Sequence, residues 1–97
     1  MAIDFLLDFL TPGEIIKQTG AKVRMIRMRR KITQEELAKK SGVSLSSLKR
    51  FEHTREISYL SLAKIASALE VEDELKNLFE KVPYNSIEEI INDEENT

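Results

Sequence analysis

The chain has 97 residues, of which 41% are hydrophobic, and this is enough for one domain with its own core. It contains no cysteine and one histidine, which excludes disulfides and leaves too few ligands for most zinc or iron sites, so no cofactor is expected. Residues 17–55 hold twelve basic and three acidic residues (+9), whereas the remainder holds three basic and fourteen acidic ones (−11). This asymmetry predicts a half that binds a polyanion, unless the charges are merely segregated on a solvated surface.

Capping signals mark the expected starts of the helices. Thr11-Pro12-Gly13-Glu14 combines an N-cap threonine, a proline at the first helical position and a glutamate with capping-box spacing. The segment Thr33-Gln34-Glu35-Glu36 repeats that spacing. Further N-cap residues are expected at Ser44, Ser58 and Ser86.

Apolar residues at three- and four-residue steps follow these starts and predict an all-α fold, a compact bundle of about five helices. Within the first helix, Gly20 costs about 1 kcal/mol relative to alanine, so that helix is expected to bend or to begin later than Pro12. Leu75, Leu78 and Phe79 predict a short fifth helix before Pro83. No stretch alternates as a strand does.

The two ends differ in composition from this central part. The chain is therefore divided into an apolar N-terminal arm (1–11), a helical domain (12–82) and an acidic C-terminal tail (83–97). The start "MAIDFLLDFL" is too short to span a membrane and lacks the basic residues of a signal peptide, which predicts a cytoplasmic protein. We expect this start to pack onto the core or across a dimer.

Residues 34–53 have the spacing of a helix-turn-helix. Ala38 is small enough for two helices to cross closely, and Gly42 can take the left-handed conformation that ends one helix and redirects the chain. Val43, Leu48 and Phe51 are spaced to bury the inner face of the second helix. The second helix of such a motif lies in the major groove of DNA.

With these residues in view, "VRMIRMRRKITQEELAKKSGVSLSSLKRFE" and "SYLSLAKIASALEV" together resemble the Cro/lambda-repressor (XRE-type) DNA-binding domain. The resemblance runs from about Lys22 to Phe79. It implies a lambda-repressor-like fold that binds double-stranded DNA.

The resemblance also implies which residues meet DNA. Side chains near the start of the second motif helix face base edges in this family, and here they are Leu45, Ser46, Ser47 and Lys49. Relatives more often have a polar residue at Leu45, which can instead pack on a neighbour. The phosphate contacts are expected from Thr33, Gln34, Ser44, Arg50, Lys31 and Arg55.

Two further residues are expected to be structural. In family members an arginine of the first helix pairs with the glutamate that ends the recognition helix, which implies an ion pair between Arg27 and Glu52 rather than a catalytic acid. His53 is expected to be a helix cap or a phosphate neighbour. The family often has glycine after the recognition helix, whereas this chain has "HTREIS", so the following turn is expected to be built differently.

Two functions fit this sequence. The first is a transcriptional repressor that binds a palindromic operator as a homodimer, with Phe5, Leu6, Phe9, Leu75, Leu78 and Phe79 as dimer or partner interface. The second is an antitoxin that neutralises a HipA-type kinase and represses its own operon, because "TPGEI", "LEVEDELKNLF" and the acidic tail are similar to HipB-type antitoxins. No Ser–His–Asp set, phosphate-binding glycine loop or metal cluster is present in the sequence, so no enzyme is expected.

Overall fold

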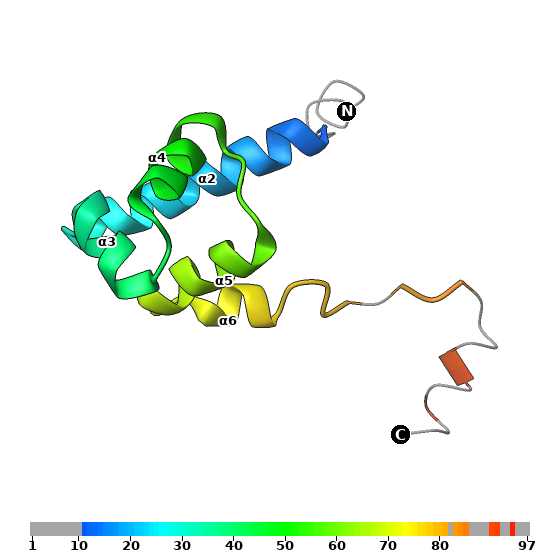
Figure 1. Cartoon of the computed structure of the whole chain (residues 1–97). Helices are drawn as coiled ribbons and strands as arrows, with labels where there is room; N and C mark the ends of the chain where they lie inside the picture. The colour runs from blue at the N-terminus through cyan, green and yellow to red at the C-terminus, as the bar shows by residue number, and fades with distance from the viewer. Residues whose placement is uncertain (1–10, 82, 86–89, 92–93, 95–97) are drawn as a thin grey trace.

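The structure is a computed structural model that describes residues 11–81, 83–85, 90–91 and 94. In that part of the chain there is no strand. Five helices follow one another within residues 11–81 (Figure 1): α2 (Pro12–Arg29), α3 (Gln34–Ser41), α4 (Leu45–Thr54), α5 (Tyr59–Ala68) and α6 (Glu72–Lys76). Residues 90, 91 and 94 are also helical. The prediction of an all-α bundle of about five helices is confirmed.

Four of the predicted N-caps are formed. The hydroxyl oxygens of Thr11, Thr33, Ser44 and Ser58 each accept a hydrogen bond of 3.1 Å from the backbone N–H three residues ahead. At Thr33 the capping box is complete, because the backbone N–H of Thr33 also donates to the Glu36 carboxylate at 3.2 Å. Ser86 lies outside the described residues.

Helix α2 begins at Pro12 and continues through Gly20, so the expected late start is wrong. The helix starts at Pro12 and runs for 18 residues, and Gly20 is buried within it. The reason for the glycine is a long-range contact: a Cβ at this position would lie 2.6 Å from Cδ of Arg55, whose side chain crosses α2 here. The lack of a side chain at Gly20 therefore makes room for the residue that ends α4.

The core lies between α3, α4 and α5. Its fully buried side chains are Leu37, Leu48, Phe51, Ile65 and Leu69. Val23 and Ile26 of α2 pack against this cluster from one side. Since α3 packs on both α4 and α5 while α2 packs on α4, the central helix-turn-helix is held from two directions.

The last helix is shorter than predicted. Helix α6 ends at Lys76, and Leu78 and Phe79 lie in the turn that follows, with Phe79 in the left-handed region (φ 59) and 85% exposed. A helix of five residues has little stability of its own, and α6 packs mainly on α5. None of the described helices is long and apolar enough to cross a lipid bilayer.

Candidate nucleic-acid interface

The turn between α3 and α4 sets the angle between the two helices. Gly42 has φ 74 and ψ 10, and its N–H donates to the Ala38 carbonyl at 3.0 Å to close α3. The next residue, Val43, turns inward and is 6% exposed. Its N–H donates to the Ser41 hydroxyl at 3.2 Å and not to a backbone carbonyl of a helix. A left-handed glycine followed by a buried valine is thus what directs α4 away from α3.

Helix α4 has two distinct faces. Leu48, Phe51 and Glu52 are buried on the inner face, whereas Ser46 and Arg50 are exposed on the other side. Lys49 and His53 are exposed next to them. The helix therefore presents a polar, partly basic surface to solvent.

Three serine hydroxyls are joined at the start of α4. The Ser44 hydroxyl donates to that of Ser47 at 2.7 Å and lies 3.3 Å from that of Ser46. Ser46 is exposed and Ser47 half-buried, and Leu45 between them and the cap is also half-buried. The hydroxyls are thereby held in place by one another before any ligand arrives.

An ion pair fixes the other end of α4. Arg27 donates from Nε and Nη2 to the two carboxylate oxygens of Glu52, both at 2.9 Å, and both residues are buried. The remaining Arg27 Nη1 donates to the Ile32 carbonyl at 2.8 Å. One guanidinium thus joins three segments: α2, α4 and the loop that precedes α3. Glu52 is held entirely within the scaffold.

The residues expected to contact phosphate occupy three places. Thr33 is exposed and Gln34 half-buried at the start of α3, where unpaired backbone N–H groups favour an anion. Lys31, exposed, precedes them in the left-handed region (φ 57). Ser44 and Arg50 are exposed on the α4 side.

Arg55 differs from these residues. It ends α4 in the left-handed region (φ 71), and its Nη1 donates to the Glu52 carbonyl. The residue is half-buried over Gly20. A phosphate contact from Arg55 would require its side chain to leave this position or to share its guanidinium.

A shallow, polar hollow joins several of these groups. It is lined by Arg24, Gln34, Lys49, Glu52, His53 and Arg55. Arg24 was not identified from the sequence, although it lies three residues before Arg27 and so on the same side of α2. Its Nε is 3.6 Å from the Glu52 carboxylate, and its side chain is 55% exposed.

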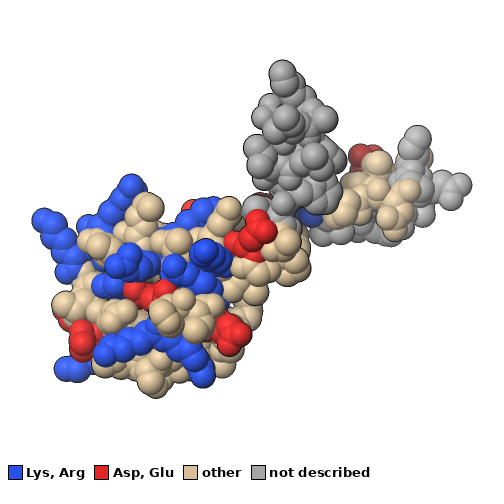
Figure 2. All heavy atoms as spheres, turned by 90° about the horizontal axis from the view of Figure 1, so that it is seen from above, with Lys and Arg blue, Asp and Glu red and all other residues tan. Residues whose placement is uncertain are grey.

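Basic side chains gather on one face of the domain. Figure 2 views the molecule from above, so that α2 and α4, uppermost in Figure 1, face the reader. Lys and Arg side chains spread across this face, and fewer Asp and Glu side chains are visible among them. Such a surface attracts the phosphate backbone of nucleic acid.

The predicted interface residues lie elsewhere. Phe5, Leu6 and Phe9 are outside the described residues. Leu75 is half-buried in α6, whereas Leu78 and Phe79 are 47% and 85% exposed. The structure thus leaves two of the six as exposed apolar groups near one another along the chain.

Comparison with known families agrees with this geometry. The model of a helix-turn-helix family, HTH_3, matches residues 23–75, which is more than half of the chain and includes α3 and α4 entirely. No curated protein and no solved structure matches the chain.

Proposed function

Because the chain belongs to the helix-turn-helix family HTH_3 and is a DNA-binding transcription regulator, we propose that it is a repressor that binds a palindromic operator as a homodimer. The observation that carries this proposal is the exposed polar face of α4, anchored from behind by the Arg27–Glu52 pair. A recognition helix that is already ordered loses little conformational entropy of its own when it enters the major groove.

In this proposal, the side chains that contact the bases of the operator are Leu45, Ser46, Ser47 and Lys49. Lys49 can donate to guanine O6 and N7, and the serine hydroxyls can donate to or accept from several bases. Leu45 can contact a thymine methyl group with the half of its surface that is exposed. Each good contact would discriminate against a wrong base by about 1–3 kcal/mol.

Register on the duplex is set by phosphate contacts. The N-terminus of α3, with Thr33 and Gln34, and that of α4, with Ser44, offer backbone N–H groups to phosphate oxygens. Arg50 and Lys31 add exposed positive charges. Arg55 contributes only when its side chain exchanges its contact with the Glu52 carbonyl.

A homodimer follows from the small number of base contacts. One α4 reads too few base edges for high specificity, whereas two copies on half-sites about one helical turn apart, ~34–36 Å, double the readout. The exposed Leu78 and Phe79 after α6 are the best-placed described residues for the interface, with Leu75 beside them. Burial of Phe79 alone would remove a large apolar side chain from water.

A second function, as an antitoxin, is favoured by the acidic stretch that follows the basic domain. Residues 70–74 carry four acidic side chains, one before α6 and three in its first turn, and the exposed Phe79 comes soon after. An acidic and apolar surface of this kind suits a protein partner such as a HipA-type kinase. A kinase gene next to this one, and a stable complex of the two purified proteins, would support this role; a mixture that elutes as separate proteins would argue against it.

The experiment that tests the repressor proposal measures binding to the DNA upstream of the gene and to random DNA across a salt series. We expect a footprint on a palindrome and a specific affinity at least ~10³-fold above random DNA. Equal, weak and steeply salt-dependent binding to both would contradict it.

Variants separate the two kinds of contact. Lys49→Ala is expected to weaken specific binding more than random binding, and Ser46→Ala with Ser47→Ala to alter sequence preference while stability changes by less than about 0.5 kcal/mol. Arg50→Ala should weaken both and reduce the salt slope by ~1. Lys76→Ala on α6 is the matched control, since it removes an exposed lysine outside the motif. If Lys76→Ala weakened DNA binding as much as Arg50→Ala, only the net charge would matter, and Arg50 would make no specific phosphate contact.

A further inference from the structure

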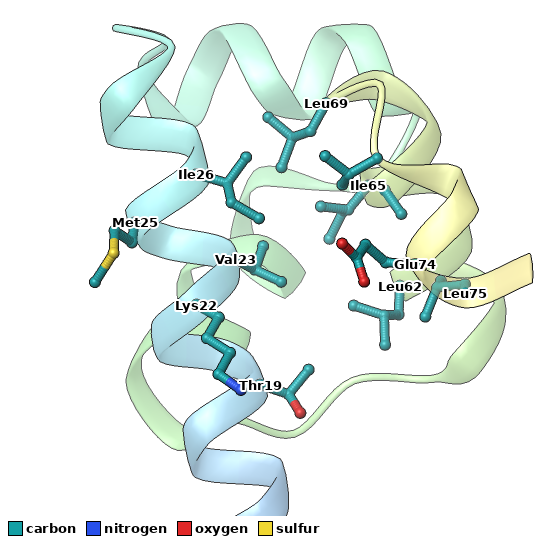
Figure 3. Close-up of a pocket in the computed structure, with 12 residues that line it drawn as sticks. Thr19, Lys22, Val23, Met25, Ile26, Leu62, Ile65, Leu69, Glu74 and Leu75 are labelled. Carbon is teal, nitrogen blue, oxygen red and sulfur yellow. The ribbon is translucent and has the colours of Figure 1, made fainter. Parts of the chain in front are cut away.

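An apolar groove lies between α2, α5 and α6, on residues that include none from α4 (Figure 3). Val23 and Ile26 point from α2 toward Leu62 and Ile65 of α5, and Leu75 of α6 closes one side. The groove has a volume of about 440 Å³. This is within the ~300–1,000 Å³ of sites that enclose drug-sized molecules, so it has room for several side chains.

The groove continues as an apolar stripe along α2. Ile15, Ile16 and Thr19 precede Val23 and Ile26 at helical spacing, but Ile15 is 51% and Ile16 46% exposed. A second hollow, lined in part by Ile16, Phe51 and Ile57, shares Thr19 and Leu62 with the groove. The two form one apolar surface that no described residue covers.

We propose that residues 1–10 of the same chain dock on the part of this surface around Ile16, Thr19 and Leu62, where the groove and the second hollow meet. The segment "MAIDFLLDFL" holds eight apolar residues and two aspartates, a composition suited to an apolar seat with a solvated edge. Asp4 and Asp8 are four residues apart and share one side of a helix. Lys22 lines the groove and is exposed, so it can pair with that acidic side.

The length of the segment fits the distance. Thr11, where the described chain begins, is eight residues before Thr19, or about 12 Å along the axis of α2. Ten residues span about 15 Å as a helix and about 33 Å when extended. The extended backbone of Thr11 (φ −72, ψ 157) lets the preceding chain leave the axis of α2 and fold back along it. If it folds back as a helix, Ile3, eight residues before Thr11, comes near Thr19, and Leu6 comes near Ile16.

Two other occupants fit less well. A second copy would have to compete with a segment tethered directly beside the groove, whose effective concentration is in the millimolar range. The acidic C-terminal tail fits less well because its carboxylates would be repelled by Glu74, which lines the groove. In addition, Ile91 of the tail is 48% exposed. If residues 1–10 dock in this way, Phe5, Leu6 and Phe9 contact their own chain and not a partner. Of the predicted interface residues, Leu78 and Phe79 then remain available to a second copy or a partner.

The absence of cysteine allows a direct test in the full-length protein. Ile3→Cys is combined with Thr19→Cys, on the apolar stripe, or with Ala21→Cys, two residues on and exposed on the opposite side of α2. We expect an intrachain disulfide to form with Thr19→Cys on the order of tenfold faster than with Ala21→Cys, because docking holds the first pair within bonding distance. Peptide mass mapping of the oxidised protein locates the bond.

Equal rates for the two pairs would overturn the proposal. An interchain disulfide through Thr19→Cys would overturn it in favour of a second copy. As an independent readout, Leu6→Asp should increase the fluorescence of an apolar dye while far-UV helicity persists, whereas Asp8→Asn should not. Unchanged dye fluorescence in Leu6→Asp would also contradict docking. DNA binding is measured separately, because the docking surface includes none of the proposed base contacts: the groove has no residue of α4, and the second hollow has only the buried Phe51 and the capping Arg55.

Discussion

Removal of the Glu52 carboxylate should destabilise the domain more than any change on its polar surface. In Glu52→Ala, Arg27, a residue that is 9% exposed, keeps its charged guanidinium and loses both charge-assisted hydrogen bonds of 2.9 Å. Breaking a buried pair from one side costs about 3–5 kcal/mol, because an uncompensated charge stays in the interior. Total stabilities of domains are ~5–15 kcal/mol, so the variant is expected to unfold at much lower urea concentration.

The structure also predicts an asymmetry between the two partners. Arg27→Met leaves the Glu52 carboxylate with Arg24, whose Nε is 3.6 Å away and whose side chain can turn toward it. Arg27→Met is therefore expected to cost less than Glu52→Ala by about 1 kcal/mol, close to the net value of one typical hydrogen bond. The double variant Arg27→Met/Glu52→Leu should be more stable than Glu52→Ala, because no charge stays buried without a partner. Its recovery is incomplete, since the Ile32 carbonyl still loses the Arg27 donor.

Urea unfolding followed by far-UV circular dichroism measures these differences, and an unchanged m-value shows that the denatured state is comparable. The control is Arg30→Ala, which removes the exposed pair between Arg30 and Glu70, 3.0 Å apart, and should cost less than about 1 kcal/mol. Equal losses for Glu52→Ala and Arg30→Ala would refute the reasoning, because burial would then have no effect on the worth of the pair.

Three substitutions test the scaffold by the same measurement. Gly42→Ala should cost about 1 kcal/mol from backbone strain alone, because φ is 74 and no atom lies within 4 Å of the added Cβ; no loss would mean that the turn relaxes. Gly20→Ala should stabilise by about 1 kcal/mol in an Arg55→Ala background but less in the parent chain, where the Cβ meets Arg55; equal effects in both would rule out that contact. Leu48→Ala should cost about 2–5 kcal/mol because its side chain is fully buried, and a smaller loss would indicate that the core collapses onto the cavity.

The parts of the fold that could be predicted are those that depend on neighbours in sequence. An N-cap requires a hydroxyl and a backbone N–H three residues ahead, so the starts at Thr11, Thr33, Ser44 and Ser58 follow from local chemistry. The turn at Gly42 is equally local, since only its own dihedral angles and the next residue decide it. For the candidate site, the sequence gives which side of α4 is polar, because the buried positions are set by helical periodicity.

The parts that could not be predicted depend on contacts distant in sequence. Nothing local in α2 indicates that Gly20 makes room for Arg55, a residue 35 positions later. Propensity alone treats that glycine as a helix defect. Likewise, Phe79 fits the spacing of a helix, but α6 ends before it. So short a helix is stable only where it packs on other elements, and Phe79, which is 85% exposed, packs on little of the described chain. Arg24 lines the polar hollow beside α4 only because α2 packs against α4.

The position of Arg27 has a consequence for how mutations of the site should be interpreted. Its guanidinium joins Glu52, on the recognition helix, to the Ile32 carbonyl, one residue before the capping threonine of α3. One side chain therefore joins the recognition helix to the loop that precedes α3, although it contacts neither phosphate nor bases in the proposed complex. A variant at Arg27 or Glu52 would lose DNA affinity through a lower population of the folded state. That loss would be recovered at lower temperature, whereas a loss caused by Lys49→Ala would persist under conditions in which the domain is fully folded.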